Sequence, residues 1–212
     1  MKNYDKFKQV NNDFFDRLIK QSTDEHTAVG QSRISHEKRF KKMLDIGDLN
    51  GKSILDVGCG LGAFYSFLNQ NNIKSDYHGI DINDKMLEGA SQKYPEIANR
   101  FSRVDLVEEA MGQEFDYSIS IGPLNLLIDE ETNYQMTFKL IDGLFKHSKI
   151  GCALSMTSIH SKVKDKDTFF FDPKVIVEYA EKLCNNFKLD HSYLPHDFTI
   201  FLYKDDFYSS FK

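Results

Sequence analysis

Short apolar runs alternate with segments of helical spacing along most of this chain. The apolar runs predict strands over residues 53–57, 76–82, 100–105, 115–121 and 152–157. Between them, apolar residues three and four positions apart predict helices over 63–71, 84–94, 130–147 and from 173 onward. Strands that alternate with helices form a mostly parallel sheet covered on both faces. The expected fold class is therefore α/β, an open three-layer sandwich.

The C-terminal part departs from this alternation. Two aromatic-rich strands, over 189–194 and 198–203, are separated only by Pro195, His196 and Asp197. So short a connection predicts an antiparallel hairpin, because parallel strands need a longer crossover. We therefore expect the last strand to run against the others.

The N-terminal part also stands outside the alternation. Residues 4–19 and 35–46 carry apolar side chains at helical spacing and precede the first strand. Two such helices are too little for a separate core. We expect a helical cap or extension over residues 1–50 and one catalytic α/β domain over residues 51–212.

Composition narrows the setting of the protein. The chain has 212 residues, with 27 Lys and Arg against 32 Asp and Glu, so its formal net charge is -5. An acidic surplus argues against a DNA partner, whereas RNA bound at a local basic patch stays open. The cysteines Cys59, Cys152 and Cys184 are widely spaced, and no Cys/His cluster predicts a metal. With no signal peptide or long apolar run, we expect a cytoplasmic monomer or homodimer without a membrane partner.

A glycine-rich turn follows the first predicted strand, in ILDVGCGLG at 54–62. Gly58, Gly60 and Gly62 let the backbone turn sharply and let a ligand touch the main chain. A turn that only joins a strand to a helix does not need three glycines in five residues. Cys59 lies inside the turn as a small residue beside the ligand, and no histidine nearby in the sequence activates it as a nucleophile.

Asp56 distinguishes two classes of nucleotide ligand. Gly58, Gly60 and Ala63 also satisfy the dinucleotide pattern G-x-G-x-x-G/A, with Asp81 about 20 residues further on. However, Asp56 lies at the mouth of the strand, where its carboxylate would repel a pyrophosphate. S-adenosylmethionine has no phosphate and carries a positive ammonium and a positive sulfonium. The sequence therefore favours this methyl donor over NAD.

Three consecutive strands are each expected to end in an aspartate. Besides Asp56, Asp81 lies at the end of the second strand and Asp105 at the end of the third. In open α/β sheets, ligands bind at those strand ends. Asp81 can accept hydrogen bonds from both ribose hydroxyls and Asp105 from an adenine amino group, with Ile82 and Leu106 beside the ring. Singly, each aspartate is more often a turn residue, but jointly they predict a nucleoside site.

With these motifs, the chain resembles the class I S-adenosylmethionine-dependent methyltransferases over about residues 51–203. The most specific stretches are LDVGCGLG at 55–62 and GIDIND at 79–84. The resemblance implies a seven-stranded sheet whose last strand is antiparallel, and S-adenosylhomocysteine as the product. It also implies donor contacts at Asp56, Gly58, Gly60, Asp81, Asp105 and the strand end at Ile121 and Gly122. The donor contacts that we predict include, besides these, Cys59, Gly62, Ile82 and Leu106.

The end of the fourth strand departs from one subfamily. It reads Ser-Ile-Gly-Pro-Leu-Asn at 120–125, where amino-methylating DNA enzymes carry Asp or Asn, two prolines and an aromatic residue. The resemblance therefore does not extend to methylation of DNA bases.

Methyl transfer mainly requires an acceptor atom held in line with the methyl carbon, in a site that excludes water. A base is needed only when the acceptor enters protonated. The polar candidates at the same edge are Asn125 after the fourth strand, His160 after the fifth and His196 in the hairpin turn. We favour His196, although each of the three also has a plain structural explanation as a cap, loop or turn residue.

The function expected is methyl transfer to an oxygen or nitrogen atom of a small-molecule acceptor. The alternatives are an RNA-nucleoside methyltransferase, which a basic stripe beside the donor would favour, and a non-catalytic protein that binds the cofactor. A nucleotide oxidoreductase is disfavoured by Asp56. The sequence itself does not identify the acceptor.

Overall fold

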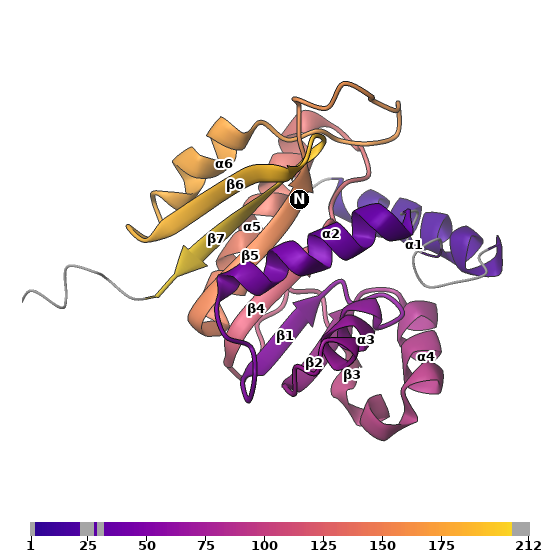
Figure 1. The fold of residues 1–212 in the computed structure, drawn as a ribbon. Coiled ribbons are helices and arrows are strands. Elements are labelled where there is room, and N and C mark those ends of the chain that lie inside the picture. The colour runs from indigo at the N-terminus through magenta and orange to yellow at the C-terminus, as the bar shows by residue number, and fades with distance from the viewer. Residues whose placement is uncertain (1–2, 22–27, 29–31, 205–212) are drawn as a thin grey trace, which may run out of the picture.

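A seven-stranded sheet forms the centre of the computed structural model, which describes residues 3–21, 28 and 32–204 (Figure 1). The strand order is β3-β2-β1-β4-β5-β7-β6, and β7 runs in the direction opposite to the other strands of this sheet. The expected fold class and the antiparallel last strand are therefore confirmed. The strands are β1 (Ser53–Val57), β2 (Asp76–Asp81), β3 (Phe101–Arg103), β4 (Phe115–Ile121), β5 (Ser148–Thr157), β6 (Phe187–Leu194) and β7 (Asp197–Tyr203).

Helices cover both faces of this sheet. The α-helices of the described residues are α1 (Tyr4–Gln21), α2 (Arg33–Met43), α3 (Ala63–Gln70), α4 (Asp84–Lys93), α5 (Glu130–Lys146) and α6 (Pro173–Ala180). In Figure 1, α2 crosses in front of the sheet while α5 and α6 lie behind it. Two 3-10 turns, η2 (Leu44–Ile46) and η3 (Pro95–Arg100), precede β1 and β3.

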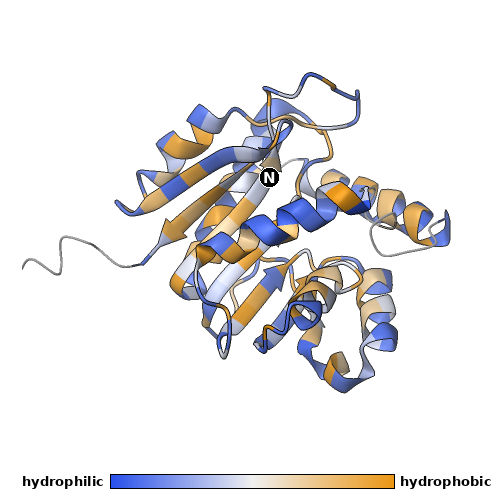
Figure 2. Ribbon diagram, viewed as in Figure 1, coloured by the Kyte–Doolittle hydropathy of each residue, from blue (hydrophilic) through white to orange (hydrophobic). Residues whose placement is uncertain are grey.

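Alternation along the strands divides the core between the two faces. Leu55 packs in the cluster that α5 and α6 complete, whereas its neighbour Ile54 packs in the cluster that α2, α3 and α4 complete. Both side chains are fully buried. The central strands are thus apolar on both faces, as a covered parallel sheet requires, and the apolar colour in Figure 2 runs through them while α2 is largely hydrophilic.

Several element ends differ from those that the sequence predicts. The third strand stops at Arg103, because the chain turns at Asp105, whose carbonyl accepts from the amides of Glu108 and Glu109. Helix α2 begins two residues earlier than expected because Ser32 caps it, accepting from the amide of Ser35.

The strands at the C-terminal half are also longer than predicted. β5 begins at Ser148 instead of residue 152, since its polar first residues pair with the start of β4. β6 begins at Phe187, and Asp197 is the first residue of β7 instead of part of the turn. The hairpin turn lies at the carboxyl edge of the sheet, because Asp197 is paired with Thr157 at the end of β5.

No helix among the described residues combines the length and the apolar character that crossing a membrane requires.

Candidate functional site

A cavity lies at the carboxyl ends of β1, β2 and β4, under the two N-terminal helices. Its floor is the glycine-rich turn after β1, and its cover comes from α1 and α2. The empty space between these walls, open solvent at the mouth included, is about 1120 Å³.

The floor of the cavity depends on left-handed glycine conformations. Gly58 has a φ of 77°, and its amide and that of Cys59 both donate to the carbonyl of Ile80, at 2.8 and 3.1 Å. Gly62 also has a φ of 77°, and a Cβ there would come within 2.8 Å of the Tyr94 ring. The start of the turn is thus hydrogen-bonded to β2, and its main chain at Gly58, Cys59 and Gly60 faces the cavity.

Asp81 joins the end of β2 to the glycine-rich turn. One of its carboxylate oxygens accepts from the Gly60 amide at 3.0 Å, and the other from the Asn83 amide at 2.9 Å. Burial raises the pKa of this carboxyl, while the backbone amides of Asn83 and Gly60 act in the opposite direction. The two bonds fix the carboxylate at the edge of the cavity, with lone pairs left for a ligand.

Asp56 lies deeper, next to the last residue of β1. Only 3% of its surface is exposed, and its carboxylate accepts from the Tyr77 hydroxyl at 2.6 Å. Burial, with a smaller contribution from the Asp81 charge, raises its pKa to about 7, although the hydrogen bond from Tyr77 acts in the opposite direction. A carboxyl that titrates near neutrality in a cleft is typical of a ligand-binding position.

Asp105 follows β3 and is covered by α1. Its Oδ1 accepts from the hydroxyl of Tyr4 at 2.5 Å and from the Val107 amide at 3.2 Å. Its Oδ2 is buried without a hydrogen bond among the described residues, although the Nζ of Lys8 lies 3.5 Å away. The ammonium of Lys8 offsets the charge of this oxygen, which leaves its hydrogen-bonding capacity unused.

Residues 55–154, from the glycine-rich turn to β5, match a family model described as a methyltransferase domain. The matched segment holds the floor of the cavity and the three aspartates, and the strand order is that of the methyltransferase fold. Over residues 55–154 the chain carries a methyltransferase domain, and its sheet has the class I Rossmann-like fold. It is therefore an enzyme whose methyl donor is S-adenosylmethionine.

Similar proteins include a curated relative and solved structures. The chain is 28% identical over 159 residues to a putative methyltransferase, Rv1506c, of Mycobacterium tuberculosis, a match covering 72% of this chain and 93% of that one. Magnesium protoporphyrin IX methyltransferase from Synechocystis PCC 6803, solved with bound S-adenosylhomocysteine, superposes with a TM-score of 0.67 at 16% identity, over 93% and 99% of the two chains. Phosphoethanolamine N-methyltransferase 1 of Haemonchus contortus superposes with a TM-score of 0.64 at 11% identity, over 94% of this chain and 50% of that chain. At such identities the two structures show a shared fold alone.

The donor-contact residues that the sequence predicts gather around the cavity of this methyltransferase. Gly62 is the exception, since it caps the start of α3 and packs against Tyr94 instead of lining the cavity. The others all line it: Asp56, Gly58, Cys59, Gly60, Asp81, Ile82, Asp105, Leu106 and Ile121.

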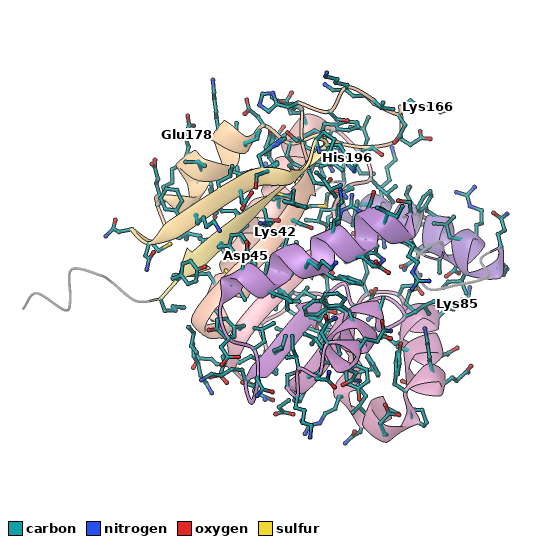
Figure 3. The ribbon with its side chains drawn as sticks, in the orientation of Figure 1. Lys42, Asp45, Lys85, Lys166, Glu178 and His196 are labelled. Atoms are coloured by element: carbon teal, nitrogen blue, oxygen red, sulfur yellow. The ribbon has the colours of Figure 1, made fainter. Side chains whose placement is uncertain are left out.

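The three acceptor-side candidates lie outside the cavity lining. Asn125 accepts from the Thr157 hydroxyl at 3.2 Å. His160 has its ring centroid 5.7 Å from that of His191. His196 is in the hairpin turn, with its side chain 37% exposed and 4.0 Å from Asp197 (Figure 3). Their catalytic roles stay predictions.

Four polar residues that the sequence analysis did not single out line the cavity. His36 and Arg39 come from α2, and Tyr4 and Asn11 come from α1. The signal that could have found them is periodicity, since each lies on the same helical face as apolar residues that are buried. Arg39 donates from Nε to the carboxylate of Asp197 at 2.5 Å, and both side chains are buried.

Proposed function

We propose that this methyltransferase transfers the methyl group of S-adenosylmethionine to an oxygen or nitrogen atom of a small-molecule acceptor. The observation that carries the proposal is the cover formed by α1 and α2, whose side chains line the cavity beside the glycine-rich turn. A small acceptor fits beneath such a cover, whereas a nucleic acid would have to extrude a base into it. The net charge of -5 also disfavours a phosphate backbone as partner.

The residues around the cavity fit the methyl donor group by group. Asp81 at the edge of the cavity suits the ribose hydroxyls, and the Oδ2 of Asp105, which accepts no hydrogen bond but is paired with Lys8, suits the adenine amino group. Asp56 supplies negative charge toward the donor's ammonium. Among the described residues that line the cavity, Arg39 is the only lysine or arginine. Its positive charge suits the carboxylate of the donor.

Substituting Asp81 by alanine is expected to weaken the binding of S-adenosylhomocysteine by ~1–3 kcal/mol, the cost of losing hydrogen bonds to a charged acceptor. Calorimetric titration measures this directly. The fold should survive because Asp81 ends a strand and is only partly buried. A folded variant with unchanged affinity would show that Asp81 only shapes the turn.

Donor affinity is expected to depend on pH through Asp56. Since burial raises the pKa of this carboxyl to about 7, acidification from pH 7.5 to 6 protonates it and removes its attraction for the ammonium. The dissociation constant of S-adenosylhomocysteine should therefore rise as pH falls, by at most about tenfold per pH unit. The Asp56→Asn variant, neutral at every pH, should lose this dependence. Equal slopes in the two proteins would contradict the assignment.

The bound donor supplies a methyl group on a positively charged sulfur that is a good leaving group. The chain must then exclude water, orient the acceptor and receive its proton if the acceptor enters as a hydroxyl or an ammonium. Among the described residues that line the cavity, His36 is the only histidine. It is 7% exposed, with its ring 4.2 Å from that of Phe40. We assign to His36 the role of proton acceptor, for which His196 stays a competing candidate.

A metabolite screen with a donor labelled in its methyl group tests the proposed function. Label recovered on an oxygen or nitrogen of a small molecule supports it. Label found only in RNA would favour the nucleoside alternative, and donor binding without any transfer would favour a non-catalytic protein.

A further inference from the structure

Helix α1 is attached at two points, to the segment that follows β2 and to the loop that follows β3. Near its start, Tyr4 donates to Asp105 at 2.5 Å. Near its end, Asp16 accepts from the side-chain amide of Asn83 at 3.1 Å and is paired with Lys85, which Figure 3 shows below α1. The helix therefore spans the edge of the cavity between the loop that carries Asp105 and the loop that follows Asp81.

Those two loops flank the proposed positions of adenine and ribose. The part of α1 between its two attachments thus lies over the adenosine moiety of the donor. Its buried residues are Tyr4, Phe7 and Asn11, three and four positions apart, so they lie on one face of the helix. That face is the one that lines the cavity.

Asn11 is the unexplained member of this face. It is 5% exposed and lines the cavity, yet its side-chain amide makes no hydrogen bond within the described part of the chain. Its neighbours Phe7 and Phe15 also line the cavity and offer no hydrogen bond. The amide atoms of Asn11 are not among the polar atoms closed off from the cavity, so a ligand there can supply the hydrogen bonds that the fold does not.

We propose that α1 is part of the donor site and that the Asn11 amide hydrogen-bonds the adenosine moiety of the methyl donor. The inference rests on the proposed function. A carboxamide both donates and accepts hydrogen bonds. The ribose hydroxyls do the same, as does the edge of adenine that carries the amino group and a ring nitrogen. Asn11 is thus a specificity-determining residue for adenosine, supplied by a helix that the sequence presents as a mere cap.

The test replaces Asn11 by leucine, which has the same branched shape and number of side-chain heavy atoms and no polar atoms. The dissociation constant of S-adenosylhomocysteine, measured by calorimetry, should rise roughly 5- to 150-fold, the range for an unmade hydrogen bond. The thermal midpoint of the unliganded variant should stay equal, since the Asn11 amide makes no hydrogen bond within the described residues. If Asn11 only supported the fold, the substitution would lower the thermal midpoint together with the affinity. Gln9→Leu, on the exposed face of α1, is the matched control and should leave affinity unchanged.

Two analogues identify the group that Asn11 contacts. S-inosylhomocysteine replaces the adenine amino group by a carbonyl, and 2′-deoxy-S-adenosylhomocysteine lacks one ribose hydroxyl. The wild-type protein should discriminate against both, and Asn11→Leu should lose the discrimination for the group that it no longer contacts. The inference is overturned if Asn11→Leu binds S-adenosylhomocysteine within twofold of wild type, if Gln9→Leu loses as much, or if both discriminations persist. A wild-type protein that ignores S-adenosylhomocysteine would instead refute the proposed function.

Discussion

Replacing His36 by alanine is expected to lower kcat by ~10²–10⁴-fold, the usual contribution of a general base. The affinity for S-adenosylhomocysteine should change little, because Asp81 and Asp105, which we assign to the nucleoside, belong to other elements. The measurement is single-turnover methyl transfer to the acceptor found in the labelled-donor screen.

His196→Ala is the decisive comparison for that result. Its imidazole is in the hairpin turn and outside the cavity lining, so its removal should cost less than tenfold. If His196→Ala is instead the slower enzyme, the hairpin histidine is the base and His36 is a packing partner of Phe40. Equal and small losses in both would indicate an acceptor that enters already deprotonated.

Arg39→Leu is expected to destabilise the fold by ~3–5 kcal/mol, the range for removing one partner of a buried ion pair. The carboxylate of Asp197 is 1% exposed, and its Oδ1 has no hydrogen bond among the described residues. Without the guanidinium, a charge remains buried where β7 begins. Chemical denaturation of the unliganded protein gives the free energy of unfolding.

Two further variants separate the pair from a general effect of the substitution. In Arg39→Leu/Asp197→Asn the buried charge is gone, so much of the stability should return. Arg33→Leu makes the same change on α2, but Arg33 and Glu37 form an exposed pair, which is worth at most ~1 kcal/mol. If Arg39→Leu costs no more than Arg33→Leu, the buried pair does not hold α2 on the sheet.

The sequence alone determined the sheet and one side of the cavity. Alternating apolar runs and helical segments predicted the order of the elements, because burial on both faces leaves a distinct pattern in each parallel strand. The carboxyl ends of parallel strands meet at one edge, so aspartates at successive strand ends could be placed together. Asp56, Asp81 and Asp105 therefore line one cavity, although the last lies two residues beyond its strand.

Only the tertiary structure decided what covers that cavity. α2 buries His36 and Arg39 beside Phe40 and Met43, and polar residues at buried positions read in a sequence as a solvated face. Arg39 meets its partner 158 residues away, and Tyr4 meets Asp105 across 101. No local pattern encodes such pairs, because their energy arises only when distant segments dock and exclude water together. Periodicity shows which residues share a face of a helix, but the partner of that face is set by packing.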